Sequence, residues 1–341
     1  MKIYRLGKQG NLRSITLFHA MARLGYRGLV ITEPADTYVS VGYFDKTEDI
    51  IDYERCKSLN IPIIRREVGG GAVLLSQGQV FYQLILPKKQ APFKVEDAYR
   101  KFSKPVIETY RRLGVEVFYR PINDLVVKSG KKISGQGAAD IGDSFVFVGN
   151  VLLQFNTKLM SELFKVQEEK FRDKLYKSLE ENITWVEKET HKSFSYQEVE
   201  NILVEEFSKL IEFEGEGEIN NQVLHLADEL MQHLTSENVL FEDTGRKHKF
   251  LKIREGVYVK NAVKKVKGGL IKAEVYIKEN IIEDVSIYGD FTLVPKNAIK
   301  DLEKELKGAS LDQVRYKIEE FLKKADMPGV HVEDLLELLL F

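Results

Sequence analysis

The chain has 341 residues, of which 43% are hydrophobic and 30% are charged, and its formal net charge is -1 at pH 7. This composition is typical of a globular protein with a sizeable core, and the length suits one large and one small domain or two medium ones. The near-neutral charge argues against nucleic acid as a partner, because binding to a phosphate backbone needs a basic surface. No apolar run is long enough to span a membrane, and the start of the chain lacks an apolar signal core. The single cysteine, Cys56, cannot form an internal disulfide and favours a reducing compartment, so we expect a cytoplasmic protein.

Helical and extended patterns alternate along the first half of the chain. Apolar side chains recur at helical spacing over residues 11–25. A charged amphipathic helix is expected over 47–59, with Thr47 suited to its first turn. A long helix over 95–113 ends before Gly114, which suits a helix stop. Strands are expected at 28–32, 38–41, 61–64, 80–86, 115–119, 124–127, 132–134 and 145–155.

The second half of the chain begins with a charged helical region and ends with a smaller α+β unit. Residues 158–212 are expected to be helical apart from 183–185, and a further helix is expected over 222–234. A polar, basic connector at 243–249 marks a change of composition. After the connector we expect strands at 250–254, 257–260, 270–277 and 281–287, and helices at 297–307, 310–325 and 332–340.

These patterns predict an α/β (α+β) protein of two domains. The larger one, over 1–243, has a mixed sheet flanked by helices, and the smaller one covers 245–341.

Two arginines precede three glycines in the segment Arg65-Arg-Glu-Val-Gly-Gly-Gly-Ala-Val73. Glycine tolerates positive φ and has no side chain, so the backbone N–H groups of such a loop can approach a flat or anionic ligand. Arg66 is suited to a charge-assisted pair with a phosphate or carboxylate. The glycines alone are equally compatible with a plain hairpin turn between the strands at 61–64 and 80–86.

Two further segments carry candidate polar groups. Lys132 opens a short strand in the segment Lys132-Ile-Ser-Gly135, and Gly135 and Gly137 indicate close approach of a ligand to the backbone. A solvated surface lysine is the alternative. Asn123 and Asp124 head a Leu-Val-Val strand, and the carboxylate is suited either to hold Mg²⁺ with phosphate oxygens or to cap a turn.

Taken together, these segments resemble the lipoate-protein ligase family. The arginine–glycine loop, the Asn-Asp-Leu-Val-Val strand, the Lys-x-Ser-Gly turn and the Gly149-Asn-x-Leu-Leu153 segment follow one another as they do in that family. Other segments similar to the family are Ser40-Val-Gly42-Tyr-Phe44, Ile183-Thr-Trp-Val186, Thr235-Ser-Glu-Asn238 and Ile281-Ile-Glu-Asp-Val-Ser-Ile-Tyr-Gly-Asp290. The resemblance therefore covers nearly the whole chain.

The resemblance implies the fold shared by lipoate ligases, biotin ligases and octanoyltransferases. It also implies a ligase that uses ATP and Mg²⁺ to activate lipoate, or octanoate, as an acyl-adenylate. The acyl group would pass to a lysine of a lipoyl-domain protein, of the 2-oxoacid dehydrogenase E2 type or the glycine cleavage H-protein type. The small domain would be needed for adenylation, and residues 245–341 would move relative to the large domain between the two steps.

The resemblance also implies roles for individual residues. Lys132 would act as an electrostatic clamp on the adenylate phosphate and the acyl carbonyl oxygen, and Asp124 would be the candidate ligand for Mg²⁺. Apolar residues near Val73 and Leu152 would line the slot for the acyl tail. The residues expected to contact ATP or the acyl-adenylate are Arg66, Gly69, Gly70, Gly71, Ala72, Val73, Leu74, Asn123, Asp124, Lys132 and Gly149.

Some positions depart from the family pattern and keep other functions open. After Ala72-Val73 the family usually has an aromatic residue followed by His-Asp, whereas this chain has Leu74, Leu75, Ser76 and Gln77. Gln136 stands where the family usually has a small residue. Phe147 and Val148 stand where the family often has His-His. These changes leave open a non-catalytic lipoyl-binding or scaffold protein. Octanoyl transfer would need a cysteine nucleophile, whereas Cys56 lies in the helix expected over 47–59, where we expect a buried structural role. Biotin ligation is disfavoured because its glycine loop usually has a different spacing.

Overall fold

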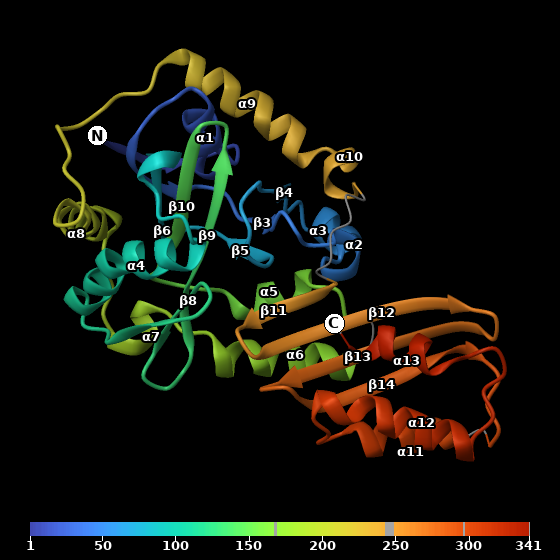
Figure 1. Cartoon of the computed structure of the whole chain (residues 1–341). Coiled ribbons are helices and arrows are strands. Elements are labelled where there is room, and N and C mark those ends of the chain that lie inside the picture. Colours follow the sequence, from blue (N-terminus) through green and yellow to red (C-terminus); the bar gives the residue numbers. More distant parts are fainter. Residues whose placement is uncertain (167–168, 243–248, 296, 341) are drawn as a thin grey trace.

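The computed structural model describes residues 1–166, 169–242, 249–295 and 297–340. The largest sheet has the strand order β1-β2-β6-β10-β9-β8-β7, and β6, β10, β9 and β8 are labelled in Figure 1. Strands β1 and β2 are parallel, and the other neighbouring pairs are antiparallel. The strands are β1 (Lys2–Gln9), β2 (Gly28–Pro34), β6 (Gln79–Pro87), β7 (Val117–Arg120), β8 (Asp124–Val127), β9 (Lys132–Ile141) and β10 (Ser144–Leu152).

Helices cover both faces of this sheet. On one face, α1 (Arg13–Arg23) contacts β2, β6 and β10 and is itself covered by α9 (Asn221–Thr235). On the other face lie α4 (Val95–Arg112) and α8 (Tyr196–Ser208). Side chains of β6 alternate between the two cores, since Phe81 packs with α1 whereas Tyr82 packs with α4 and α8. Since both faces of β6 are covered, side chains that point to either face are buried. This explains why the strand is apolar along nearly its whole length.

A second, smaller sheet holds the glycine segment and has the order β4-β3-β5. Its strands are β3 (Tyr38–Val41), β4 (Ile63–Arg65) and β5 (Val73–Leu75). Strands β4 and β5 pair with opposite edges of β3, so the segment 66–72 crosses from one edge of this sheet to the other. The plain hairpin between the strands at 61–64 and 80–86 is therefore wrong, because β4 and β6 belong to different sheets.

The helix expected over 47–59 is also wrong in detail. It is divided into α2 (Thr47–Ile50) and α3 (Tyr53–Ser58), because Ile51 is extended and Asp52 starts a new helix by accepting a hydrogen bond from the Arg55 backbone N–H. Thr47 does not cap α2, since its hydroxyl donates to the Leu240 carbonyl.

Strands β1 and β5 were not expected from the sequence. The helical region that follows contains α5 (Thr157–Leu163), α6 (Glu169–Asn182) and α7 (Val186–Thr190).

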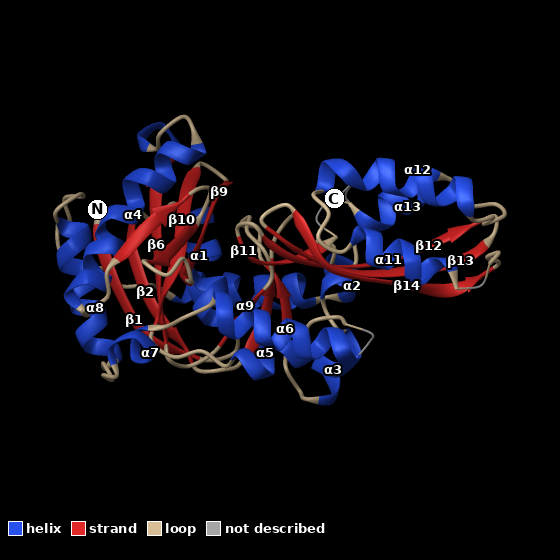
Figure 2. Cartoon of the chain, turned by 90° about the horizontal axis from the view of Figure 1, so that it is seen from below, coloured by secondary structure: helices blue, strands red, loops and turns tan. Residues whose placement is uncertain are grey.

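The C-terminal part of the chain is an antiparallel sheet with helices on one side. Strands β11 (Phe250–Arg254), β12 (Val257–Val266), β13 (Gly269–Lys278) and β14 (Ile281–Phe291) are neighbours in that order. Helices α11 (Ala298–Leu306), α12 (Val314–Lys324) and α13 (Val332–Leu339) lie on one side of the sheet, and α6 lies on the other (Figure 2). We call residues 249–340 the C-terminal unit.

The C-terminal unit also shares a core with the rest of the chain. Leu175 and Leu179 of α6 belong to the same apolar cluster as Leu251, Ile253 and Val257. The expected boundary near 244, and all of the expected connector except Lys249, lie outside the described residues. Within those residues, no helix has the length and apolar character to cross a bilayer.

Candidate active site

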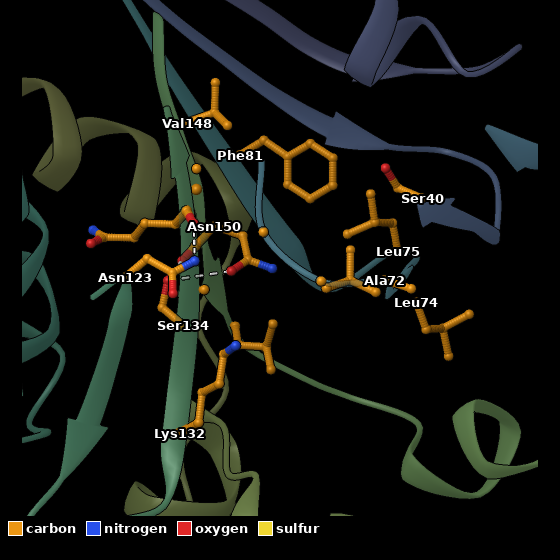
Figure 3. Close-up of a pocket in the computed structure, with 18 of the residues that line it drawn as sticks. Ser40, Ala72, Leu74, Leu75, Phe81, Asn123, Lys132, Ser134, Val148 and Asn150 are labelled. Carbon is orange, nitrogen blue, oxygen red and sulfur yellow. Dashed lines mark hydrogen bonds between the residues drawn. The ribbon is translucent and has the colours of Figure 1, made fainter. Parts of the chain in front are cut away.

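One pocket brings together the glycine segment, the start of β9 and the end of β10 (Figure 3). Among the described residues, its lining contains no acidic side chain and three basic ones, Arg66, Lys132 and Lys252. Of the residues expected at the site, those that line the pocket are Arg66, Gly69, Gly70, Gly71, Ala72, Val73, Leu74, Asn123, Lys132 and Gly149. Asp124 is not part of the lining and is fully buried.

Lys132 extends from the first position of β9 toward the other residues of the pocket (Figure 3). Its Nζ lies 2.9 Å from Oδ1 of Asp124, and 18% of its side chain is exposed. The strand expected at 132–134 is confirmed as the start of β9, which pairs with β8. Gly135 leaves room for the Lys132 side chain, since a Cβ at this position would lie 3.1 Å from the lysine Nζ. The Lys132 ammonium group therefore lies beside Gly135, where no side chain is in its way.

Asp124 holds this ammonium group in place. Burial alone would raise the pKa of Asp124, but Lys132, Lys252 and a hydrogen bond from the Glu255 backbone N–H outweigh burial and lower it below its usual value. The Glu255 N–H lies 2.9 Å from Oδ2 of the carboxylate. Asp124 therefore remains ionised at neutral pH and provides a fixed countercharge for Lys132.

The neighbouring Asn123 is fixed by its own contacts. Its side-chain nitrogen donates to the Gln136 carbonyl at 2.7 Å, and its backbone carbonyl accepts from the Gln136 N–H at 2.9 Å. The Mg²⁺ role expected for Asp124 does not fit this geometry, because its Oδ1 faces Lys132, its Oδ2 accepts from the Glu255 N–H and the residue lies outside the pocket lining. Among the described residues, no group of three His, Cys, Asp or Glu side chains is placed to hold a metal.

Arg66 shapes the glycine segment. Its Nη2 donates to the carbonyls of Gly69 at 3.1 Å and Gly71 at 2.8 Å, and its Nη1 donates to the Ser40 carbonyl at 3.0 Å. Gly70 has a φ of 97°, and a Cβ there would lie 3.0 Å from Arg66 Nη2. Only a residue without a side chain fits comfortably between the guanidinium group and the backbone that it holds.

The side of the pocket away from Lys132 is apolar. Ile15 and Phe18 of α1 contribute to it, with Leu75, Phe81 and Val148 from the two sheets. In Figure 3, Phe81 and Val148 lie across the pocket from Lys132. The pocket therefore has one cationic end and one apolar end, which suits a ligand with a charged head and an aliphatic tail.

Val73 and Leu152, near which the sequence placed the slot for the tail, also line the pocket. Among the residues that depart from the family pattern, Leu74, Leu75, Gln136 and Val148 do so as well. The Gln136 side chain is held by two hydrogen bonds, since it accepts from Ser103 and donates to Tyr82. Phe147 is buried in the core beneath α4.

Several residues of the pocket were not anticipated from the sequence. Ile15 and Phe18 looked like ordinary core residues of an amphipathic helix. Lys252 and Ile253 come from β11, and a single lysine in a short strand gives no signal of its own. Cys56 behaves as expected, because it is fully buried outside the pocket lining and burial raises the pKa of its thiol to about 12.

Comparisons with known proteins identify the family of this chain. Residues 16–208 match the model of the lipoyl protein ligase A/B catalytic domain, and residues 258–339 match that of the bacterial lipoate protein ligase C-terminus. Lipoate–protein ligase 2 of Staphylococcus aureus is 26% identical over 317 residues, which cover 89% of this chain and 87% of the relative. Octanoyltransferase LipM of Oceanobacillus iheyensis is 26% identical over 195 residues, covering 52% of this chain and 71% of the relative.

Among solved structures, the chain resembles one from a study of a bi-partite lipoate protein ligase and its E2 lipoyl domain from Thermoplasma acidophilum. The TM-score is 0.62 at 25% identity, and the match covers 70% of this chain and 95% of that one. The α/β fold expected from the sequence is thereby confirmed. Since the catalytic-domain model alone spans more than half of the sequence, the chain belongs to the lipoyl protein ligase A/B catalytic-domain family.

Proposed function

We propose that the protein is a lipoate–protein ligase, which activates lipoate or octanoate with ATP and transfers the acyl group to a lysine of a lipoyl-domain protein. One observation carries this proposal: a single pocket joins the Lys132 ammonium group and a side-chain-free backbone segment to an apolar wall. An acyl-adenylate has the matching parts, namely an anionic phosphate, a polarised carbonyl and an aliphatic tail. The names of the relatives in the family support the same activity.

In the first step, a carboxylate oxygen of lipoate attacks the α-phosphorus of ATP, and the bond to pyrophosphate breaks. Lys132 is placed to stabilise the negative charge that develops on the phosphate oxygens, as a preorganised donor does. Asp124 is a positioning residue in this step, because it holds the ammonium group without lining the pocket itself. The N–H groups of Gly69–Gly70–Gly71 add neutral donors to the same end of the pocket.

In the second step, the amine of the acceptor lysine attacks the acyl carbonyl carbon, and AMP leaves. Lys132 is then the donor for the oxyanion formed at that carbonyl, so one group serves both steps. Lys132 is not the nucleophile, since its ammonium group is paired with an ionised carboxylate. The apolar wall at Phe81 and Val148 holds the tail and fixes the position of the carboxylate.

Mg²⁺ bound with ATP would be held by phosphate oxygens and water rather than by Asp124, because that carboxylate is fully buried, lies outside the pocket lining and already faces Lys132. When bound, the ion supplies positive charge that offsets the charge of the phosphates. The acceptors we propose are lipoyl domains of the E2 and H-protein types, in the cytoplasm. We further propose that residues 1–243 form the catalytic domain and that residues 245–341 form an accessory domain that moves between the two steps.

The test is a pair of assays with the purified protein: ATP–pyrophosphate exchange, and acyl transfer to a purified lipoyl domain, each with lipoate, octanoate and biotin. We expect exchange and transfer with lipoate or octanoate and neither with biotin. Binding of lipoate without exchange would instead identify a carrier or scaffold protein. In that case the pocket binds the acyl group but does not activate it.

Octanoyl transfer is the second candidate, because octanoyltransferases are among the relatives. That reaction uses octanoyl-acyl carrier protein without ATP and needs a thiolate at the pocket. Cys56 is buried elsewhere and its pKa is raised to about 12, so it is unsuited to the role. Transfer from octanoyl-acyl carrier protein in the absence of ATP would overturn the ligase proposal.

A further inference from the structure

The C-terminal unit contributes a cation to the pocket. Lys252 lies on β11, and its Nζ is 3.4 Å from Oδ1 of Asn123 and 2.6 Å from Oε2 of Glu255. The side chain is 19% exposed and forms part of the pocket lining together with Ile253. This ammonium group therefore faces the same end of the pocket as Lys132, although it comes from a different sheet.

The strand that carries Lys252 is attached to the centre of the site. The backbone N–H of Glu255, at the end of β11, donates to Asp124, the carboxylate that holds Lys132. The β11 backbone also lies over the glycine segment, since a Cβ at Gly71 would be 3.6 Å from the Cβ of Lys252. Lys252 is thus placed by the same contacts that organise the rest of the pocket.

The charges around the pocket favour an anionic ligand between the two lysines. Arg66 directs its guanidinium group at backbone carbonyls of the loop, and the buried Asp124 already faces Lys132. The partner of Lys252 is Glu255, whose side chain is 34% exposed. Solvent reaches part of this pair and weakens it relative to a fully buried one, so a phosphate oxygen can compete with the Glu255 carboxylate for Lys252.

We propose that Lys252 binds a phosphate oxygen of the nucleotide during adenylate formation, so that the C-terminal unit supplies a binding group and not only a cover. This inference rests on the proposed ligase function. A lysine ammonium on a flexible stem is well suited to a phosphate as a point charge. The C-terminal unit then has a direct chemical part in the first step, through one residue of β11.

The test compares Lys252→Met with Lys252→Arg in the full-length chain. For Lys252→Met we expect the KM for ATP in the exchange assay to rise at least about tenfold, as for the loss of a charge-assisted hydrogen bond. The KM for lipoate should change far less, and Lys252→Arg should restore most of the ATP affinity. Lys265→Met, on an exposed lysine of the same sheet, is the matched control and should behave as the wild type does.

A merely structural role of the Lys252–Glu255 pair is tested separately. If the pair only held β11 in place, Glu255→Gln would cause the same loss as Lys252→Met. We expect Glu255→Gln to leave the KM for ATP unchanged or lower, since it releases Lys252 for the phosphate. Equal losses in the two variants, or unchanged ATP kinetics in Lys252→Met, would overturn the inference.

Direct calorimetry of ATP binding separates this inference from the proposed function. A wild-type protein that shows no exchange, yet binds ATP at least about tenfold more tightly than Lys252→Met, would refute the ligase activity and keep Lys252 as a phosphate ligand. If the wild-type protein catalyses exchange but its ATP affinity does not depend on Lys252, the ligase activity is supported and the role of Lys252 is refuted.

Discussion

The two lysines of the pocket are fixed in very different ways. Lys132 stands on β9, between two neighbouring strands of the largest sheet, and its partner Asp124 is fully buried. Lys252 stands on β11, an edge strand of the C-terminal sheet, and its partner Glu255 is partly exposed. The core therefore holds one cation rigidly, and the C-terminal unit brings the other. In the proposed mechanism, the rigid cation is the oxyanion donor in both steps, and the cation of the C-terminal unit binds the nucleotide in the first.

The largest expected effect comes from removing the rigid cation. Lys132→Ala should lower the rate of ATP–pyrophosphate exchange about 100- to 1000-fold, as for the loss of a single oxyanion donor. Lys128→Ala is the control, because Lys128 is an exposed lysine just before the same strand. Acyl transfer from added lipoyl-adenylate, which bypasses adenylate formation, distinguishes the role of Lys132 from that of Lys252. Lys132→Ala should impair that step as well, whereas Lys252→Met should affect mainly adenylate formation. Near-normal exchange in Lys132→Ala would refute its role.

The second prediction concerns the buried partner. Asp124→Asn leaves Lys132 without its countercharge and should lower the free energy of unfolding at pH 7 by up to about 3 kcal/mol, with the partial exposure of Lys132 limiting the loss. The pKa of Asp124 is lowered in the folded state, so its stabilisation is present above the unfolded pKa of about 4 and is lost as the pH falls through the lower, folded value.

Urea unfolding at a series of pH values measures this difference. The gap between the wild type and Asp124→Asn should be constant from pH 7 down to about pH 5 and should then close under more acidic conditions. A gap that stayed the same at all pH values would show that the carboxylate charge contributes nothing. In that case Asp124 would not fix Lys132 electrostatically.

The third prediction concerns the glycine segment, where Gly70 lies against the Arg66 side chain. Gly70→Ala forces a side chain into a left-handed conformation and into contact with Arg66, so we expect a loss of about 1–3 kcal/mol together with weaker adenylate binding. Gly130→Ala is the matched control, because Gly130 has a φ of 82° but no atom within 4 Å of an added Cβ. It should show the conformational cost alone. Equal effects of the two substitutions on ligand binding would mean that contact with Arg66 is unimportant.

The local parts of this site could be predicted from the sequence because glycines and charged residues mark their own positions. The glycine segment, Lys132 and Asn123 were found because each stands where a strand begins or a loop needs positive φ. Their shared pocket depends on the sheet order, which places β9 beside both β8 and β10. Periodicity contains no information about that order.

Other features depended on tertiary contacts that no local pattern records. The break between α2 and α3 arises where Asp52 accepts from the Arg55 backbone, and the helical periodicity on either side concealed it. Lys252 reaches the site through tertiary contacts of β11, such as the hydrogen bond from the Glu255 N–H to Asp124. A lysine in a polar strand has no sequence feature that distinguishes it from a solvated one.

The smallest expected effect separates the two activities found among the relatives. Cys56→Ala should keep exchange and acyl transfer at wild-type rates, because the thiol lies outside the pocket lining and its raised pKa keeps it protonated. The substitution leaves only a small cavity, so we expect a stability loss of about 1 kcal/mol by thermal or urea unfolding. An enzyme that used Cys56 as its nucleophile would instead lose transfer almost completely, even if its stability hardly changed. Since Cys56 is the only cysteine in the chain, this single substitution tests every mechanism that passes through a thioester on the protein.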